Sequence, residues 1–374
     1  MKLWRIRHSP GASIGGWSKH LLIFWTVASL LAPSPFIVNA SMPMWHKYTY
    51  NDPTGSRLYF VYTPVNYQVG KAVPLVVMLH GCGQTALNFA LGTRMNQLAD
   101  EHQFIVMYPQ QIITSNPNLC WNWFNPANQV RGSGEPAMIV GIIETMQQNT
   151  AQWTIDTRRI YVAGVSAGAA MAVILGATYP DIFAAIGVHS GVEYQAATGR
   201  IKAVKAMRQG GPDPVEQGQA AYDAMGAFAH VVPTIVFQGT GDNIVNSVNG
   251  DQVVQQWMQT DALASKSTYQ ADFYNPSSNT VGQVPDGHSY TTYTWNDRAG
   301  SEVQEYWKIK NMGHAWSGGS PNASYTDPQG PDASQAMYTF FMNHPMPMDK
   351  TGGQTSFWGK LRRTLVDWFK AEFG

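Results

Sequence analysis

A serine in a glycine-flanked turn is the feature of this sequence that points most directly to chemistry. Residues 159–168 read as a β-branched strand that runs into Gly164, Ser166 and Gly168, and a helix-forming run of small residues follows. A serine on a sharp strand-to-helix turn presents its hydroxyl to a substrate, and glycines two positions away let neighbouring backbones pass closely. The pattern therefore predicts Ser166 as a nucleophile for acyl transfer.

The same five-residue pattern occurs a second time, at residues 11–15. That copy has no β-branched strand before it, and it precedes an apolar segment typical of an export signal. We interpret the copy at residues 11–15 as accidental because the motif needs a strand on one side and a helix on the other. A packing turn of small residues is the alternative interpretation of this segment. The choice between the two depends on whether the sequence also supplies a catalytic histidine and carboxylate.

A nucleophilic serine needs a histidine that removes its proton and a carboxylate that orients the histidine. In folds with this type of turn the chain order is serine, acid, histidine. Asp242 follows the apolar run 232–238 on a glycine-containing loop, and His314 follows the last predicted strand. We predict Asp242 as the acid and His314 as the base.

Other ionisable residues are weaker candidates. Asp181, Asp286 and Asp297 lie in predicted loops, caps or turns, and we interpret them as structural. His288, in a predicted hairpin arm, is the alternative base, although a lone histidine in a loop is usually a solvated side chain. We interpret His80 as a buried structural residue rather than a proton carrier.

The oxyanion of an acyl-transfer intermediate needs two backbone donors. One is normally the residue after the serine, here Ala167, and the other lies in the loop after an early strand. The apolar run 74–79 ends in the glycine-containing segment 80–84, whose glycines allow the amides to turn inward. We therefore predict Cys82 as the second oxyanion donor.

Cys82 and Cys120 are the two cysteines of the sequence. Two cysteines in an exported chain often pair because that compartment is oxidising. We expect a Cys82–Cys120 disulfide that braces the oxyanion loop. Two buried thiols are the alternative.

Composition excludes several classes of function. The 374 residues carry 24 Lys plus Arg against 24 Asp plus Glu, so there is no basic footprint for nucleic acid. An aromatic content of 12% argues against disorder. The sequence shows no phosphate loop, dinucleotide fingerprint or zinc-ligand spacing, so no metal or cofactor is indicated. An uncharged ligand fits this composition.

Residues 1–40 predict an export signal. Four basic residues precede an apolar run at 21–31, and the small residue Ala40 stands at the expected cleavage point. We expect cleavage before Ser41 and a secreted catalytic domain over 41–348. An uncleaved membrane anchor is the alternative, although the run is short for a membrane span.

The C-terminal residues 349–374 have a different character. Their apolar residues recur at helical spacing and alternate with basic residues. The pattern predicts an amphipathic helix that lies on a membrane or a hydrophobic polymer surface. A terminal helix that docks on the body of the protein is an equal alternative.

Alternating strands and helices set the expected fold class. The predicted strands are 74–80, 104–109, 159–166, 184–189, 232–238 and 302–309, and amphipathic or small-residue helices separate most of them. This alternation predicts one α/β domain with a mostly parallel sheet that helices cover on both faces. Candidate catalytic residues then fall at the carboxyl ends of strands, where ligands bind in such sheets. The polar segment 266–300 carries a predicted hairpin arm at 288–295, which we expect at the rim of the site.

The ordered set of motifs resembles a known family. The chain resembles polyhydroxybutyrate (PHB) depolymerases and related esterases of the α/β-hydrolase superfamily, which also includes feruloyl and acetylxylan esterases. The resemblance spans most of the predicted mature chain and rests on residues 79–84, 120–124, 164–168, 239–242 and 313–319. It implies an α/β-hydrolase fold, a triad of Ser166, Asp242 and His314, an oxyanion contact from the Cys82 amide, and an ester substrate.

The sequence departs from the family pattern in two places that carry no chemistry. Gly83 stands where the family often has threonine, and Gln238 stands where it often has histidine. The sequence also shows no linker or binding module of the kind that many secreted depolymerases use to hold solid polymer. We expect a secreted serine esterase that hydrolyses poly(3-hydroxybutyrate), related short-chain polyhydroxyalkanoates or their oligomers. A soluble ester is the alternative substrate.

Three tryptophans, Trp121, Trp123 and Trp316, are candidate substrate-binding residues. They could line an aliphatic cleft or stack on sugars, while burial in the core is at least as good an interpretation for two of them. The alternative functions are therefore a carbohydrate esterase that removes feruloyl or acetyl groups and, more distantly, a non-catalytic polymer-binding protein on a hydrolase fold.

Overall fold

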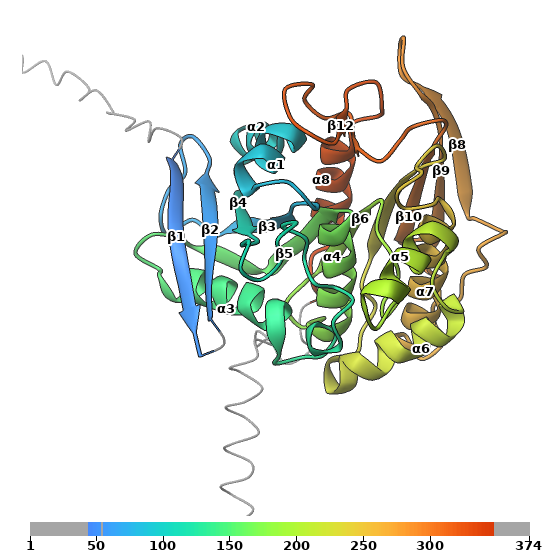
Figure 1. The fold of residues 1–374 in the computed structure, drawn as a ribbon, viewed down its shortest axis with the longest axis horizontal. Coiled ribbons are helices and arrows are strands. Elements are labelled where there is room, and N and C mark those ends of the chain that lie inside the picture. Colours follow the sequence, from blue (N-terminus) through green and yellow to red (C-terminus); the bar gives the residue numbers. More distant parts are fainter. Residues whose placement is uncertain (1–43, 54, 348–374) are drawn as a thin grey trace, which may run out of the picture. The chain divides into compact units, whose positions relative to one another are not determined.

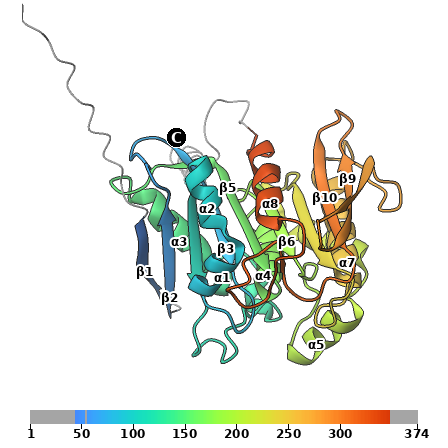
Figure 2. The ribbon, with the colours of Figure 1, turned by 90° about the horizontal axis from the view of Figure 1, so that it is seen from above.

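The computed structural model describes residues 44–53 and 55–347, which form a ten-stranded sheet and flanking helices. The strand order is β1-β2-β4-β3-β5-β6-β7-β10-β9-β8. The hairpin of β1 and β2 lies at one edge of the sheet and the β8–β9 pair lies at the other (Figure 1; Figure 2). The sheet strands are β1 (Met44–Asp52), β2 (Gly55–Thr63), β3 (Val73–Leu79), β4 (Ile105–Gln110), β5 (Ile155–Val165), β6 (Ala185–His189), β7 (Thr234–Gly239), β8 (Ser278–Gln283), β9 (Ser289–Asn296) and β10 (Glu302–Ile309).

The six central strands, β4, β3, β5, β6, β7 and β10, run parallel to one another. Every residue of β3 is buried, as expected for a strand that is covered on both faces. All six strands that the apolar runs predicted are present within a few residues of their expected bounds. The predicted α/β class is confirmed.

The sheet edges differ in how well the sequence indicated them. The predicted hairpin arm is confirmed: β9 pairs with β8 on one side and with β10 on the other, both antiparallel. The β1–β2 hairpin was not predicted. Buried and partly exposed positions alternate along β2, and a strand with one partly solvated face lacks the continuous apolar run that marks a strand covered on both faces.

Helices cover both faces of the sheet and bury two separate apolar clusters. One cluster joins the sheet to α3, α4, α5, α6 and α7, and the other joins it to α1, α2 and α8. Along β3, Leu75, Val77 and Leu79 point to the first cluster, and Val76 and Met78 point to the second. The helices are α1 (Ala86–Thr93), α2 (Met95–His102), α3 (Gly134–Gln148), α4 (Ala167–Thr178), α5 (Arg200–Gln209), α6 (Pro214–Met225), α7 (Val248–Ala264) and α8 (Ala333–Asn343), with two 3₁₀ turns at Pro126–Asn128 and Gly226–Phe228.

Helix α4 explains how the small-residue run after Ser166 folds. All twelve of its residues are buried, and the run Ala-Gly-Ala-Ala-Met-Ala has high helix propensity with no polar face. A helix that is apolar all round has to lie in the interior. The turn that carries Ser166 is therefore anchored to a buried helix that begins at the very next residue.

The parallel topology brings the candidate residues to one edge of the sheet. Ser166 directly follows β5, Asp242 follows β7, and His314 follows β10. A short parallel pair, β11 (Trp316–Ser317) and β12 (Thr326–Asp327), orders the loop that follows β10. The carboxyl ends of these parallel strands meet at one edge, so the fold gathers residues that are far apart in the sequence.

Two predicted segments lie outside the described residues. They are the export signal at 1–40 and the amphipathic tail at 349–374. Within the described part of the chain, no helix combines the length and the apolar character that a membrane crossing requires.

Candidate active site

Ser166 occupies a strained backbone position. Its φ of 57° and ψ of −121° place a non-glycine residue at positive φ, immediately before α4. Such conformations are costly and persist only where the surroundings impose them, which is why they cluster at functional sites. The Ser166 N–H donates to the carbonyl of His189 at the end of β6, with an N–O distance of 2.9 Å. The serine therefore stands at a turn of the type that its flanking glycines predicted.

The two flanking glycines are required by close backbone packing. A Cβ on Gly168 would lie 2.6 Å from the carbonyl carbon of Leu79 and 2.7 Å from the carbonyl oxygen of His80. A Cβ on Gly164 would lie 2.7 Å from the Leu79 oxygen. Any side chain at these positions would collide with main-chain atoms, which cannot swing aside. The glycines thus let the turn pack against the end of β3.

Asp242 and His314 form a buried pair. The Nδ1 atom of His314 donates to Oδ2 of Asp242 over 2.7 Å, and the aspartate is only 4% exposed. The other carboxylate oxygen, Oδ1, accepts from the backbone N–H groups of Ile244 at 2.9 Å and Val245 at 2.8 Å. These contacts fix the carboxylate on three sides.

Several opposing effects set the pKa of Asp242. Burial raises it, but the hydrogen bond and charge interaction with His314 and the two backbone donors together hold the pKa below its usual value. The carboxylate is therefore ionised at neutral pH. An ionised carboxylate on Nδ1 keeps the proton on that nitrogen and leaves Nε2 of His314 free to take a proton from a hydroxyl.

Glycines at the end of β7 and in the loop after it allow the loops that carry Asp242 and His314 to meet. A Cβ on Gly239 would lie 2.8 Å from the Met312 carbonyl carbon, and one on Gly241 would lie 2.9 Å from the Asn311 oxygen. The Gly241 N–H donates to the Met312 carbonyl over 3.0 Å, and the hydroxyl of Thr240 accepts from the Asn311 N–H over 2.9 Å. The two loops are thus joined through their backbones just before Asp242 and His314.

The loop at residues 80–84 lies beside the serine. A Cβ on Gly81 would lie 3.4 Å from the Ser166 Cβ, so this glycine also permits close approach. The side chain of Gln84 fixes the loop: its Oε1 accepts from the Gly81 N–H over 2.9 Å, and its Nε2 donates to the Ser324 carbonyl over 2.8 Å. Cys82, a predicted oxyanion donor, is therefore held in a braced turn next to the candidate nucleophile, and Ala167, the other predicted donor, follows that serine directly.

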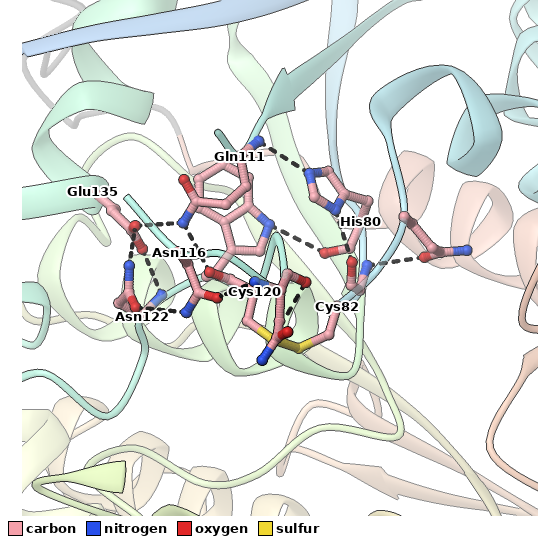
Figure 3. The surroundings of a disulfide bond; sticks show 11 residues. His80, Cys82, Gln111, Asn116, Cys120, Asn122 and Glu135 are labelled. Carbon is pink, nitrogen blue, oxygen red and sulfur yellow. Dashed lines mark hydrogen bonds between the residues drawn. A yellow bond between two sulfur atoms is a disulfide. The ribbon is translucent and has the colours of Figure 1, made fainter. Parts of the chain in front are cut away.

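Cys82 and Cys120 form the expected disulfide, with their Cα atoms 4.2 Å apart (Figure 3). The Gly83 N–H donates to the Asn118 carbonyl over 2.8 Å and reinforces the same junction. The covalent bond links the loop after β3 to the segment that follows β4. It thereby restrains Cys82.

His80 is a structural residue in this arrangement, as predicted. The ring is fully buried; Nδ1 donates to the Gly81 carbonyl over 2.8 Å, and Nε2 accepts from the Gln111 N–H over 3.1 Å (Figure 3). The indole N–H of Trp121 donates to the His80 carbonyl over 3.1 Å. Burial lowers the pKa of His80 to about 4, so the ring is neutral and both nitrogens are committed to holding the loop.

Glu135 binds the segments on either side of Cys120, the second cysteine of the disulfide. The sequence did not indicate this role. This buried carboxylate accepts from Gln111 Nε2 at 2.5 Å and from the backbone and side-chain nitrogens of Asn122 at 2.7 and 2.8 Å (Figure 3). A guanidinium nitrogen of Arg57 lies 3.9 Å away. These partners come from separate segments, so no local pattern could have marked them.

Comparisons with known proteins agree with this geometry. Residues 58–272 match the family model described as Esterase PHB depolymerase. Poly(3-hydroxyalkanoate) depolymerase C of Paucimonas lemoignei is 32% identical over 297 residues, which cover 76% of this chain and 66% of that protein. The chain belongs to the PHB depolymerase esterase family. Its family and fold are those of carboxylic-ester hydrolases.

Two further comparisons describe the reach of this relationship. Feruloyl esterase B of Neurospora crassa is 30% identical over 214 residues, which cover 55% of this chain and 70% of that protein. Among solved structures, acetyl xylan esterase from Aspergillus awamori has a TM-score of 0.63 at 20% identity and covers 80% of this chain and 99% of its own. The Aspergillus structure shows a shared α/β-hydrolase fold. The alignment with the Paucimonas depolymerase spans just under two thirds of that protein's length.

The three tryptophans predicted as candidate substrate-binding residues are all buried, so burial in the core, which the sequence offered as the alternative for two of them, holds for all three. Trp121 is 0% exposed, Trp316 is 1% and Trp123 is 5%. Trp121 supports His80, and the indole N–H of Trp316 donates to the Ser334 hydroxyl over 3.0 Å. The rings of Trp121 and Trp316 therefore have a structural role in the core, because burying so large an apolar side chain stabilises the folded protein.

The alternative base, His288, lies in a different set of contacts. Its Nε2 atom is 2.9 Å from Oδ2 of Asp327, a residue of β12, and both side chains are about one-fifth exposed. His288 thus pairs with a carboxylate other than Asp242. Among residues 44–53 and 55–347, no group of three or more His, Cys, Asp or Glu side chains is arranged to hold a metal ion.

Tyr325 is a second residue that the sequence reasoning missed. Its ring lies edge-on to the His314 ring with 6.5 Å between centroids, and the side chain is 48% exposed. Its φ of 53° is strained for an aromatic residue. The tyrosine stands in a polar loop with no distinctive spacing, so only the folded loop shows that it borders the candidate base.

We expect Gly168→Ala to lower the free energy of unfolding by about 2 kcal/mol or more, because the added methyl group meets backbone rather than movable side chains. Gly313→Ala is the matched control, since a Cβ there meets nothing within 4 Å. Urea denaturation of both variants measures the effect. Equal stability of the two variants would contradict the packing argument.

Buried neutral histidines should make the protein sensitive to mild acid. His80 has a folded pKa of about 4 against an unfolded value near 6.5, so the unfolded chain takes up a proton that the folded protein does not. The free energy of unfolding should therefore fall as pH drops from about 6.5 to about 4, by about 1.4 kcal/mol per pH unit for this group.

Denaturation of the wild type and His80→Gln across this pH range isolates the contribution of His80. The wild type should lose stability faster than the variant, so the difference between them should shrink as pH falls. Parallel curves would show that His80 is not held neutral.

Proposed function

We propose that this protein is a secreted serine esterase that hydrolyses ester bonds of poly(3-hydroxybutyrate) or related short-chain polyhydroxyalkanoates and their oligomers. The observation that carries the proposal is the position of Ser166 on a strained, glycine-flanked turn, with the Asp242–His314 pair on loops at the same edge of the sheet. A carboxylate-oriented histidine is what a serine hydroxyl needs in order to act as a nucleophile.

In the proposed mechanism, Nε2 of His314 takes the proton of the Ser166 hydroxyl while Oγ attacks the ester carbonyl carbon. The carbonyl oxygen becomes an oxyanion that accepts from the N–H groups of Cys82 and Ala167, each worth about 10²–10³ in rate. Collapse of the intermediate breaks the ester C–O bond, and the alcohol leaves with the proton from His314. His314 then takes a proton from a water molecule, whose oxygen attacks the acyl carbon. The bond between that carbon and Oγ breaks, Oγ regains the proton from His314, and the acid product leaves.

The surroundings of the candidate site favour an apolar ester. Helix α1 starts just after the oxyanion loop and exposes Leu87 at 50% and Leu91 at 52%. The same helix holds the loop of Tyr325, because Asn88 Oδ1 accepts from the Ser324 hydroxyl over 2.6 Å. Exposed aliphatic groups on the helix after the oxyanion loop, together with an exposed aromatic ring beside His314, suit an aliphatic polyester chain. The depolymerase name of the Paucimonas relative supports the same substrate class.

A carbohydrate esterase is the second candidate function. The feruloyl esterase name of the Neurospora relative, at 30% identity, favours it. The burial of Trp121 and Trp316 counts against it, because these rings cannot stack on a sugar without opening the core. A non-catalytic binding role has the least support, since it would leave the strained serine and the buried Asp242–His314 pair unexplained.

Export is part of the proposal. A disulfide persists in oxidising compartments, so the Cys82–Cys120 bond supports the export signal predicted at residues 1–40. Contact of the segment 349–374 with a hydrophobic surface stays a prediction from sequence.

The test is release of 3-hydroxybutyrate from amorphous PHB by the protein, with p-nitrophenyl butyrate, methyl ferulate and acetylated xylan assayed beside it. We expect hydrolysis of PHB and p-nitrophenyl butyrate.

Ser166→Ala, with unchanged thermal unfolding, should retain less than about one hundredth of the activity, because loss of a triad member costs far more than that. Activity confined to feruloyl or acetyl esters would favour the carbohydrate esterase over the polyester hydrolase. An active Ser166→Ala variant would refute the assignment of Ser166 as the nucleophile.

Tyr325 should contribute to substrate binding. Tyr325→Ala should raise KM for p-nitrophenyl butyrate and PHB oligomers by roughly tenfold, because about 1.4 kcal/mol of apolar contact is lost, and should change kcat little. Tyr325→Phe should resemble the wild type. Tyr274→Ala is the matched control, since Tyr274 is 82% exposed in the segment between α7 and β8, which carries none of the candidate residues. Equal KM values for Tyr325→Ala and Tyr274→Ala would contradict this role.

A further inference from the structure

We infer that His189 is a positioning residue that couples the turn carrying Ser166 to the loop carrying His314. The inference rests on the proposed function and adds to it a residue that neither contacts substrate nor belongs to the triad. His189 is the last residue of β6, the strand between β5 and β7. It thus stands between the strands that lead to the candidate nucleophile and the candidate acid.

The first link is through the backbone. The His189 carbonyl accepts from the Ser166 N–H over 2.9 Å. Ser166 has a strained φ, so a fixed acceptor for its N–H is one of the contacts that hold the turn in this conformation. The position of the nucleophile therefore depends on the end of β6.

The second link is through the side chain. Nε2 of His189 accepts from the backbone N–H of Ser317 over 3.0 Å. Ser317 lies three residues after His314 in β11, and its hydroxyl donates to the Pro331 carbonyl over 2.6 Å. The imidazole thereby holds the short β11–β12 pair that follows the candidate base.

The ring itself is locked in place. It is fully buried and stacks on Trp316, with centroids 5.1 Å apart, and on Phe237 of β7 at 5.6 Å. Nδ1 lies 3.1 Å from the Ser190 hydroxyl. Because Nε2 accepts from an N–H, the proton has to be on Nδ1, where it can donate to that hydroxyl. A locked ring with one assigned tautomer is a rigid spacer between the two loops.

The ring is also held neutral. Burial, followed by the charge of His314, lowers the pKa of His189 to about 3, while the negative charge of Asp242 has a smaller, opposite effect. A neutral ring keeps the Nε2 lone pair that Ser317 requires. It also adds no repulsion when His314 becomes an imidazolium during the proposed reaction.

His189 has no room for a direct chemical role, because both nitrogens are occupied and no part of the ring is exposed. Its effect has to be geometric. A displacement of about 1 Å between nucleophile and base can cost on the order of a hundredfold in rate. Loss of the side-chain link should therefore lower kcat and leave substrate affinity nearly unchanged.

Three substitutions separate the possibilities. In His189→Gln, the amide oxygen reaches the place of Nε2 and can still accept from Ser317. In His189→Asn, the shorter amide reaches only the place of Nδ1. In His189→Phe, a stacking ring remains but both polar contacts are lost. All three variants keep the backbone carbonyl that binds the Ser166 N–H.

The measurement is kcat and KM for p-nitrophenyl butyrate, normalised to folded protein by circular dichroism, together with the rate of labelling by a fluorophosphonate. We expect kcat to fall by about tenfold to a hundredfold in the Asn and Phe variants, with KM within about twofold of the wild type. The Gln variant should regain kcat to within about threefold, and labelling rates should follow kcat. If the Phe variant does not fold, the comparison of Gln with Asn decides the matter.

Equal kcat in the Gln and Asn variants, or a wild-type kcat in the Phe variant, would overturn the role of His189. A fall in folded fraction that alone accounts for the lost activity would do the same. Failure of the proposed function would appear differently, because the wild type would neither hydrolyse the ester nor be labelled at Ser166. The two failures are therefore distinguishable in one set of assays.

Discussion

The close packing of one turn against one strand end is the constraint on which the rest of the candidate site depends. Gly168 and Gly164 lie so near the backbone of Leu79 and His80 that neither position has room for a Cβ. This contact fixes Ser166 at positive φ and places the oxyanion loop beside it. The strain of the turn is offset by α4, which is buried along its whole length.

The remaining candidate residues are brought to that turn by backbone contacts between loops. Glycines after β7 let the loop of Asp242 bind the segment just before His314. His189 then connects the serine turn to the segment just after His314. His314 is therefore held on both sides, and most of the contacts that hold its loop involve main-chain atoms, which move less than side chains.

A buried polar network likewise fixes the loop at residues 80–84, the candidate oxyanion loop. The disulfide joins Cys82 to Cys120, and Glu135 binds the segments on either side of that second cysteine. Each polar group is costly to bury alone, so the network is stable only when all its members are present. Rigid donors in such a loop would stabilise an oxyanion without having to reorganise during the reaction.

The sequence by itself determined the α/β class, the six parallel strands, the β9 arm, the disulfide and the family, because continuous apolar runs, glycine spacing and ordered motifs are local signals. It also indicated Asp242 and His314, which the structure brings within 2.7 Å of each other, through their places after strands. Only the tertiary structure revealed the β1–β2 edge hairpin and the contacts of Glu135, His189 and Tyr325, and only it decided between exposure and burial for Trp121, Trp123 and Trp316. Each of these features depends on which segments become neighbours after folding. The linear sequence around a half-buried strand, an indole or a lone polar side chain does not indicate which residues it will contact.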